Sequence, residues 1–322
     1  ATDSKSTADS ITFIGKAEGT AVSDASATVL ANGTGIDGGA DDDTITSNNT
    51  ISVTTTANAA VKSTSNADSY ATFGGASSMG VSDASANVLA EAMGISGGAG
   101  NDVITSSALI GVEAQSVGSV EATSNVNANV TFGGASSEAA SDASVVKKGS
   151  ATGIDGGEGA DIIVNNNGLY VSAISAGTVT SASKASASAF IGSATSITAS
   201  AAALEGTVDT KGVIGGSGAD MITNLGRVDS IADATLYVNN SSVATAKSDF
   251  IGDADARASS VSTLQGKASS LGVSGDEGID LIENEGVVNV SAIANVTVQS
   301  STVAIAESFW GSSYTEAASS NF

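Results

Sequence analysis

Apolar and polar residues alternate along most of the chain, and the alternation recurs at a fixed interval. After each copy of a Gly-rich segment, the residues eight, ten and twelve positions beyond its Asp are apolar or small, as at Ile110, Val112 and Ala114. A period of two residues is the signature of a β-strand. A helix would need apolar residues three and four positions apart, and the Val, Ile and Thr content also favours strands. The sequence therefore predicts an all-β protein.

Two markers show that the chain is a repeat. The Gly-rich segment reads GIDGGADDDTI from Gly35, GISGGAGNDVI from Gly94, GIDGGEGADII from Gly153, GVIGGSGADMI from Gly212 and GVSGDEGIDLI from Gly272, with starts 59, 59, 59 and 60 residues apart. A Phe-x-Gly triplet keeps the same interval, and it begins at Phe13, Phe73, Phe132, Phe190, Phe250 and Phe309. The markers define repeats at approximately 13–72, 73–131, 132–189, 190–249 and 250–308, with a partial sixth at 309–322.

The composition predicts a thin core. Seven Phe, four Tyr and one Trp cannot fill the interior of a globular domain of 322 residues. In a solenoid, small side chains suffice, because each rung buries its inward face against the rungs above and below. We therefore expect residues 1–322 to form one continuous, elongated β-solenoid, similar to a parallel β-helix or β-roll. An alternative is a string of antiparallel β-sandwich modules, each of which would almost lack a core.

Details of the rungs can also be predicted. Solenoid rungs commonly take roughly 18–30 residues, so each copy is expected to hold two or three rungs. Lys147 and Lys148 are expected to be a solvated pair in a loop. The apolar residue two positions after each motif Asp should point inward, and the residue four positions after it should form a hydrogen-bonded ladder between copies. The second set is Ser47, Ser106, Asn165, Asn224 and Asn284.

Charge and missing residue types exclude several functions. The chain has no His, Cys or Pro, so a Ser-His-Asp triad, a His-ligated zinc site and a disulfide are all excluded. A net charge of −23 repels nucleic acid and anionic membranes and attracts cations. No apolar run is long enough for a membrane span. Because the acids recur evenly and no copy carries a unique constellation, no catalytic residue or organic cofactor site is predicted.

The segment Gly97-Gly98-Ala99-Gly100-Asn101-Asp102-Val103-Ile104 resembles the nonapeptide GGxGxDxUx of RTX (repeats-in-toxin) calcium-binding proteins. Two copies depart from this pattern, since Asp41 replaces the third Gly of the first copy and Asp276 the second Gly of the fifth. The resemblance implies bound Ca²⁺ between loops of adjacent turns, and secretion through a bacterial envelope to the cell surface or the extracellular space.

The residues of the motif suit Ca²⁺ independently of this resemblance. Gly permits positive φ, so carbonyl groups can converge, and a carboxylate then completes an all-oxygen site. The candidate carboxylates are Asp43, Asp102, Asp161, Asp220 and Asp280, with Asp41 and Asn101 beside them. Because each copy has only one motif, the other half of each site is expected from a different loop, and the candidates are Asp24, Asp83 and Asp142. The alternative is a Gly-rich structural turn with a solvated Asp.

Together these features predict a secreted, calcium-stabilised structural protein without enzymatic activity. Its expected partners are copies of itself, stacked head to tail into an extracellular filament through the partial copy around Phe309 and Trp310. The alternatives are a calcium-dependent adhesin stalk or a surface-layer protein with cell-surface or glycan contacts, and, less favoured, a polysaccharide-acting β-helix enzyme. Nucleic acid and membrane insertion are not expected.

Overall fold

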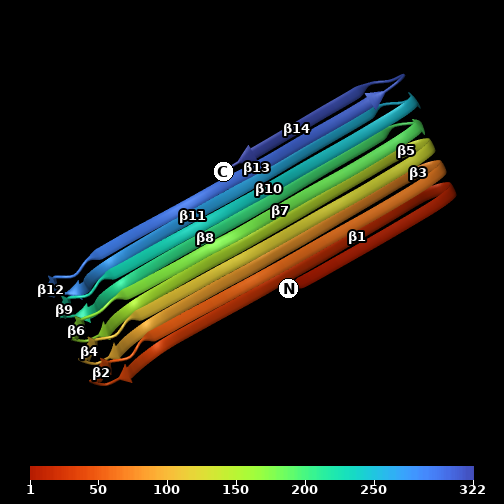
Figure 1. Cartoon of the computed structure of the whole chain (residues 1–322). Helices are drawn as coiled ribbons and strands as arrows, with labels where there is room; N and C mark the ends of the chain where they lie inside the picture. The colour runs from red at the N-terminus through yellow and green to blue at the C-terminus, as the bar shows by residue number, and fades with distance from the viewer.

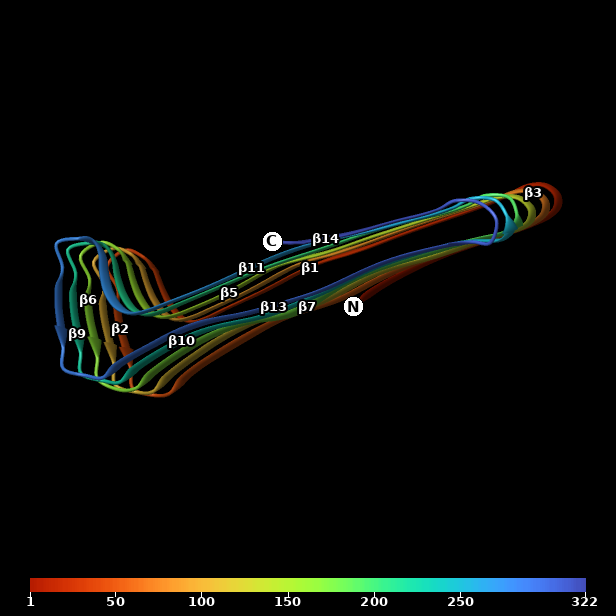
Figure 2. The same ribbon diagram turned by 90° about the horizontal axis from the view of Figure 1, so that it is seen from above.

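The computed structural model describes all 322 residues and shows a flat stack of rungs (Figure 1). Each rung runs out along one long layer of strands and comes back along a second long layer (Figure 2). At one edge, here called the wide edge, the layers separate and a short strand closes the rung; at the other, the narrow edge, they meet in a turn. All elements are strands, and all their pairings are parallel, which confirms the predicted all-β solenoid.

Fourteen strands make up the rungs. Three of them run unbroken through the narrow-edge turn, namely β1 (Thr2–Ala40), β3 (Ile51–Ala99) and β5 (Ile110–Glu158). In later rungs this turn separates a return strand from an outgoing strand, namely β7 (Leu169–Ile191) from β8 (Ala194–Gly218), β10 (Val228–Ile251) from β11 (Ala254–Gly278), and β13 (Val288–Ser308) from β14 (Ser313–Asn321). The wide edge is closed by β2 (Thr44–Ser47), β4 (Val103–Ser106), β6 (Ile162–Asn165), β9 (Met221–Asn224) and β12 (Leu281–Asn284).

Each 59-residue copy makes one rung. Ile110 pairs with Ile51 on one side and with Leu169 on the other, and the same interval holds along both long layers. The single interval of 60 arises at a narrow-edge turn, where the register shifts between Ser248 and Ile251. The expectation of two or three rungs per copy is therefore wrong, because each long strand crosses the whole width of the plate without a turn.

The size of the buried side chains follows the separation of the layers. At the wide edge the interior is filled by Ile95, Ile104 and Ile110, none of which is exposed. Near the narrow edge the corresponding inward residues are Ala, such as Ala71 and Ala128. At the wide edge, a short third strand holds the layers apart and large side chains fill the space between them. At the narrow edge there is no third strand, and the small Ala side chains let the two layers approach each other. The predicted thin core is confirmed.

Buried serines occupy the middle of the plate. The Ser82 hydroxyl donates to the Ser63 hydroxyl (2.9 Å), and Ser63 donates to the backbone oxygen of Ser23 (2.9 Å). The same position three rungs later holds Ser260, whose hydroxyl lies 2.7 Å from that of Ser300. These hydrogen bonds join the two layers and satisfy the hydroxyl groups that make them, whereas the buried hydroxyl of Ser200 in the same column has no partner.

The phenylalanines of the narrow edge occupy two neighbouring positions of the turn. Phe73 pairs with Ile14 of the rung before, and Phe132 pairs with Ile191 of the rung after. Phe73 and Phe132 therefore stand one position later in the turn than Phe13, so the Phe-x-Gly triplets, which recur at the same interval in the sequence, do not place every Phe at the same position. Where Phe stands at the later position, the earlier one holds Thr72 or Thr131, and in the other four turns the later position holds Ile or Trp.

Candidate metal centre

The Gly-rich motifs form the turns that lead from the outgoing layer to the short strands of the wide edge. Successive turns lie directly on one another, with Gly98 paired to Gly39 and to Gly157. A Cβ atom on Gly98 would overlap the carbonyl oxygen of Gly39, and its φ of +105° lies in the left-handed region. Close stacking of the rungs therefore requires glycine here, whether or not a metal ion binds.

The two copies that depart from the motif keep its backbone conformation. Asp41 has a φ of +80° in the place of the third Gly, and Asp276 has a φ of +63° in the place of the second Gly. Asp adopts this conformation more readily than most residues with a side chain. Gly100 faces Asp41 of the preceding rung. The side chain of Asp41 is exposed at this turn.

The five motif aspartates form a ladder along the stack. The backbone N–H of Asp43 donates to Oδ1 of Asp102 (2.8 Å), and that of Asp102 donates to Oδ1 of Asp161 (2.7 Å). The same bond joins Asp161 to Asp220 (2.8 Å) and Asp220 to Asp280 (3.0 Å). Four of the five carboxylates, those of Asp102, Asp161, Asp220 and Asp280, thus tie their turns to the turn of the preceding rung. Charged acceptors make such bonds stronger than neutral ones.

The second oxygen of these carboxylates has no partner. Oδ2 of Asp43, Asp102, Asp161 and Asp220 is buried and accepts no hydrogen bond. Asp102, Asp161 and Asp220 are 0–2% exposed as whole residues. In Asp102 this oxygen points into the turn, 2.5 Å from where a Cβ atom of Gly97 would lie. A column of unsatisfied, buried carboxylate oxygens therefore runs along the inside of the turns, and burying a charge unpaired is costly.

The electrostatics of the column favour a neutral or neutralised state. Burial raises the pKa of Asp161, and the charges of Asp220 and Asp102 raise it further, against the opposing effect of the hydrogen bond from the Asp102 backbone. Burial likewise raises the pKa of Asp220, with a smaller contribution from Asp280. A proton or a cation at Oδ2 would offset the cost of burying the charge and would reduce the repulsion between neighbouring carboxylates.

Asn101 belongs to a second, exposed ladder beside the first. Its backbone N–H donates to Oδ1 of Asp42 (2.7 Å), and its own side-chain oxygen accepts the N–H of Ala160 (2.9 Å). The oxygen that was a candidate metal ligand is thus already used in joining two rungs. No group of three or more acidic side chains converges to hold an ion anywhere in the chain.

Asp24, Asp83 and Asp142 lie elsewhere. They pair with one another in register in the middle of the outgoing layer and point outward. The fifteen residues of extended strand from Asp83 to Gly98 span about 50 Å, so the structure does not bring these acids to the motif turns. Burial and the neighbouring charge of Asp83 raise the pKa of Asp142. The neighbour of each motif turn is instead the same turn of the next rung.

The inward anchors follow the prediction in the inner rungs. Ile104, Ile163 and Ile222 are fully buried. The ladder four positions beyond each Asp forms only among Asn165, Asn224 and Asn284, because the hydroxyl groups of Ser47 and Ser106 donate to backbone oxygens of their own turns. Asn165 donates from Nδ2 to Oδ1 of Asn224 (2.7 Å), and Asn224 donates to Asn284 in the same way (2.6 Å).

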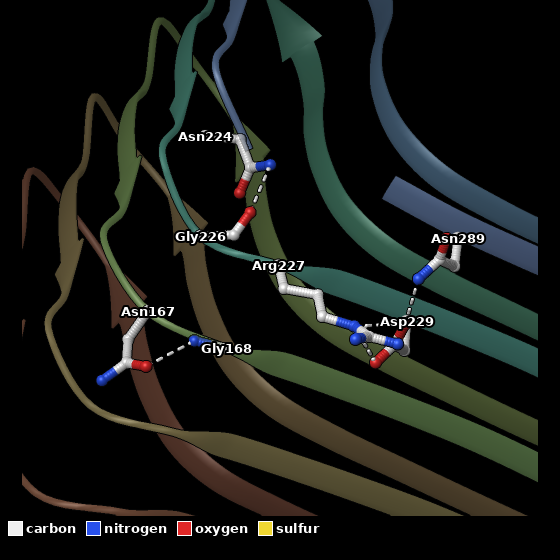
Figure 3. Close-up of polar contacts among 7 residues, drawn as sticks. All are labelled: Asn167, Gly168, Asn224, Gly226, Arg227, Asp229 and Asn289. Carbon is white, nitrogen blue, oxygen red and sulfur yellow. Dashed lines mark hydrogen bonds and ion pairs between the residues drawn. The ribbon is translucent and has the colours of Figure 1, made fainter. Parts of the chain in front are cut away.

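Other parts of the wide edge also carry polar contacts. Asn224 caps its own turn through the Gly226 carbonyl (3.1 Å), whereas Ser106 bonds only within its own turn. Figure 3 shows this turn beside an exposed cluster in which Arg227 and Asn289 both donate to Asp229. These two hydrogen bonds, that from Asn289 first, lower the pKa of Asp229.

Lys147 is the most unusual ionisable residue, and its location differs from the solvated loop that was predicted for it. Lys147 lies inside the plate, in β5, and is 1% exposed, and its Nζ has no hydrogen-bond partner. Gly118 and Gly177 on the return layer leave the room that it fills. Burial lowers its pKa to about 7. Lys148 points outward and pairs with Glu91 (3.6 Å), as a solvated lysine would.

Comparison with family models, with curated proteins and with solved structures gives no match to this chain. The likeness to RTX proteins therefore rests on the motif residues alone. The structure contains no helix with the length and apolar character needed to cross a membrane.

Proposed function

We propose that this chain is a structural repeat protein, a stiff plate of stacked rungs stabilised by divalent cations, with Ca²⁺ as the natural ion. The observation that carries the proposal is the column of buried, unpartnered carboxylate oxygens at the wide edge. Asp43, Asp102, Asp161, Asp220 and Asp280 would hold the ions between successive rungs. The chemistry supplied by the ion is neutralisation of charge in an all-oxygen environment, which suits Ca²⁺.

Repulsion within the column supports this proposal. Carboxylates one rung apart are separated by about 4.8 Å, so each neighbouring pair repels by roughly 3 kcal/mol at an effective dielectric constant of about 20. The hydrogen bonds at Oδ1 offset part of this cost, but they leave Oδ2 without a partner. The net charge of −23 adds a general repulsion that bound divalent ions would also reduce.

A structural role is favoured over an enzymatic one by the way the chemistry is distributed. Acids, amides and aromatic residues recur in columns, so each rung presents nearly the same groups as its neighbours. We place the protein outside the cell, where Ca²⁺ is abundant. The open backbone edges of the outermost described rungs would accept a further rung in the same parallel register, from adjoining chain or from a second copy. Stacking of copies would give a filament, and an adhesin stalk or surface layer would use the same rungs.

Melting of the chelator-treated protein with and without millimolar Ca²⁺ tests the cation. At a free ion concentration 100-fold above the dissociation constant, each site adds about 2.7 kcal/mol to the free energy of unfolding. Asp102→Asn should lower this calcium-dependent gain, because its amide oxygen can still accept the N–H of Asp43 while its charge is gone. Asp83→Asn removes an exposed, stacked charge and serves as the control. An equal melting temperature in chelator and in Ca²⁺ would contradict the proposal, and negative-stain microscopy of the same samples will show whether filaments form.

A further inference from the structure

The narrow edge carries an exposed row of aromatic side chains, which we call the aromatic ridge. It consists of Phe13, Phe73, Phe132, Phe190, Phe250 and Phe309, with Trp310 beside the last. Their exposed fractions range from 39% for Phe132 to 71% for Phe309. Six of the seven phenylalanines and the only tryptophan of the chain thus stand at the surface, on one edge of the plate.

The core does not use these rings. Behind the turn, the two layers pack through Ala71, Ala128 and Ala187, which are 0–1% exposed and leave no space for a larger side chain. The turn itself is made by glycines with positive φ, such as Gly133. Neither the fold of the turn nor the packing behind it therefore requires an aromatic residue in every rung.

The rings form an ordered column. Phe73 and Phe132 are stacked, with centroids 5.0 Å apart and planes 5° from parallel. Phe250 is stacked in the same way with Phe190 (6.0 Å, 12°) and with Phe309 (6.5 Å, 9°). Phe13 meets Phe73 edge to face (5.8 Å, 81°), and the ring position in the turn changes between Phe132 and Phe190. The ridge therefore consists of two stacked runs of rings, each spaced at the interval of the rungs.

The size and charge of the ridge are those of an interface. At about 200 Å² for each ring, the exposed fractions amount to roughly 700 Å² of aromatic surface. The largest apolar patch of a typical monomer is about 300–600 Å², and a stable complex buries about 800 Å² on each partner. Within three residues of each Phe the acids are Asp249, Asp253 and Glu307, all in the last two of the six turns, so most of the ridge carries no negative charge that would repel a second copy.

We propose that the aromatic ridge is an interface between two copies of this chain, which lie edge to edge and are related by a two-fold axis. A second copy is the partner whose surface has the same straight shape and the same rung period, so the rings of one ridge can pack along the rings of the other. A two-fold axis uses the same patch on both partners and closes the assembly at a dimer. This contact is separate from the stacking of rungs and from the aspartate column, and it does not depend on the ion.

Sedimentation velocity over a concentration series, in Ca²⁺, tests the interface. The wild-type chain should show a monomer–dimer equilibrium, and a variant with Phe73→Ser and Phe132→Ser should have a dissociation constant at least tenfold higher. The control carries Val146→Ser and Tyr170→Ser, because these side chains are about equally exposed (48% and 43%) but lie in β5 and β7 far along the strands from the narrow edge. Unchanged circular dichroism would show that both variants fold. A wild-type chain that stays monomeric, or a dimer weakened equally by both variants, would overturn the proposal.

Cysteine cross-linking gives an independent test, because the chain has no cysteine of its own. Ser193→Cys places a thiol in an exposed turn near the middle of the ridge, and oxidation should then yield a disulfide-linked dimer. Ser107→Cys, exposed at the wide edge, should remain monomeric. Cross-linking of both variants to the same extent would contradict the proposal. A second outcome would also contradict the proposal. If the monomer bound phosphatidylcholine vesicles, and if replacing Phe73 and Phe132 abolished this binding, the ridge would face lipid and not a second copy.

Discussion

The Lys147→Met variant should be more stable than the wild-type chain, by about 4 kcal/mol at pH 7. The ammonium group is buried without a partner, and its pKa falls from the ordinary 10.5 to about 7. The unfolded chain therefore binds a proton between pH 7 and 10.5 that the folded chain does not, and wild-type stability rises with pH across that interval. Methionine fills the same space between Gly118 and Gly177 without the charge.

Urea denaturation at several pH values measures this effect. The difference between the variant and the wild type should be largest below pH 7 and should shrink as the pH approaches 10.5. Lys148→Met is the matched control, because Lys148 is the next residue and points outward, so its replacement should change stability by less than about 1 kcal/mol. A destabilised Lys147→Met variant, or a difference that does not change with pH, would show that the amine is solvated or paired.

The second large effect is expected at a motif glycine. Gly157→Ala should lower the free energy of unfolding by about 3 kcal/mol or more, because its φ of +104° is strained for alanine and the new Cβ would overlap the carbonyl oxygen of Gly98. In Gly111→Ala the new methyl group meets open space, so that variant should be unchanged or slightly stabilised. Denaturant titration of the two variants compares them directly. Equal stability of both would mean that the motif turns are not closely stacked.

The sequence predicted the class of fold because its two strongest signals are physical requirements of stacking. Alternating residues such as Ile110 and Val112 point inward as the period of two requires. The motif glycines recur at 59 residues because each turn lies on the next, and Asn224 and Asn284 recur because their amides bond between rungs. Each of these contacts joins a residue to its counterpart in the next rung. The same residue type therefore recurs in the sequence once per rung.

The prediction of two or three rungs per copy followed from the usual size of a solenoid rung, and the glycines of this chain do not reveal the greater width. Gly118, Gly177 and Gly206 look like turn residues in the sequence, yet all three lie within long strands. They leave room for a large side chain on the facing layer, as Gly206 does for Leu236, whose Cδ2 lies 2.7 Å from where a Cβ atom would be. Local sequence does not separate a glycine that makes a turn from one that makes space, so it does not show how far a strand runs before it turns.

The position of Lys147 could have been found from the repeat. Val29 and Val88 precede it at intervals of 59, and both belong to the inward column of the outgoing layer. The five motif aspartates are recognisable in the sequence by their interval, but the bonding of their oxygens depends on the neighbouring rung and not on the motif. For the same reason Asp24, Asp83 and Asp142 share the phase of the repeat without sharing the location of the turns.

Calcium titration by isothermal calorimetry tests the central claim most directly. Five stacked aspartates leave four intervals, so the wild-type chain should bind up to about four Ca²⁺ ions, one in each interval. A variant with Asp102→Asn and Asp161→Asn disturbs three of these intervals and should retain about one ion, whereas a variant with Asp83→Asn and Asp142→Asn should bind as the wild type does. Absence of binding by the wild-type chain, or an unchanged stoichiometry in the first variant, would contradict a cation-stabilised aspartate column.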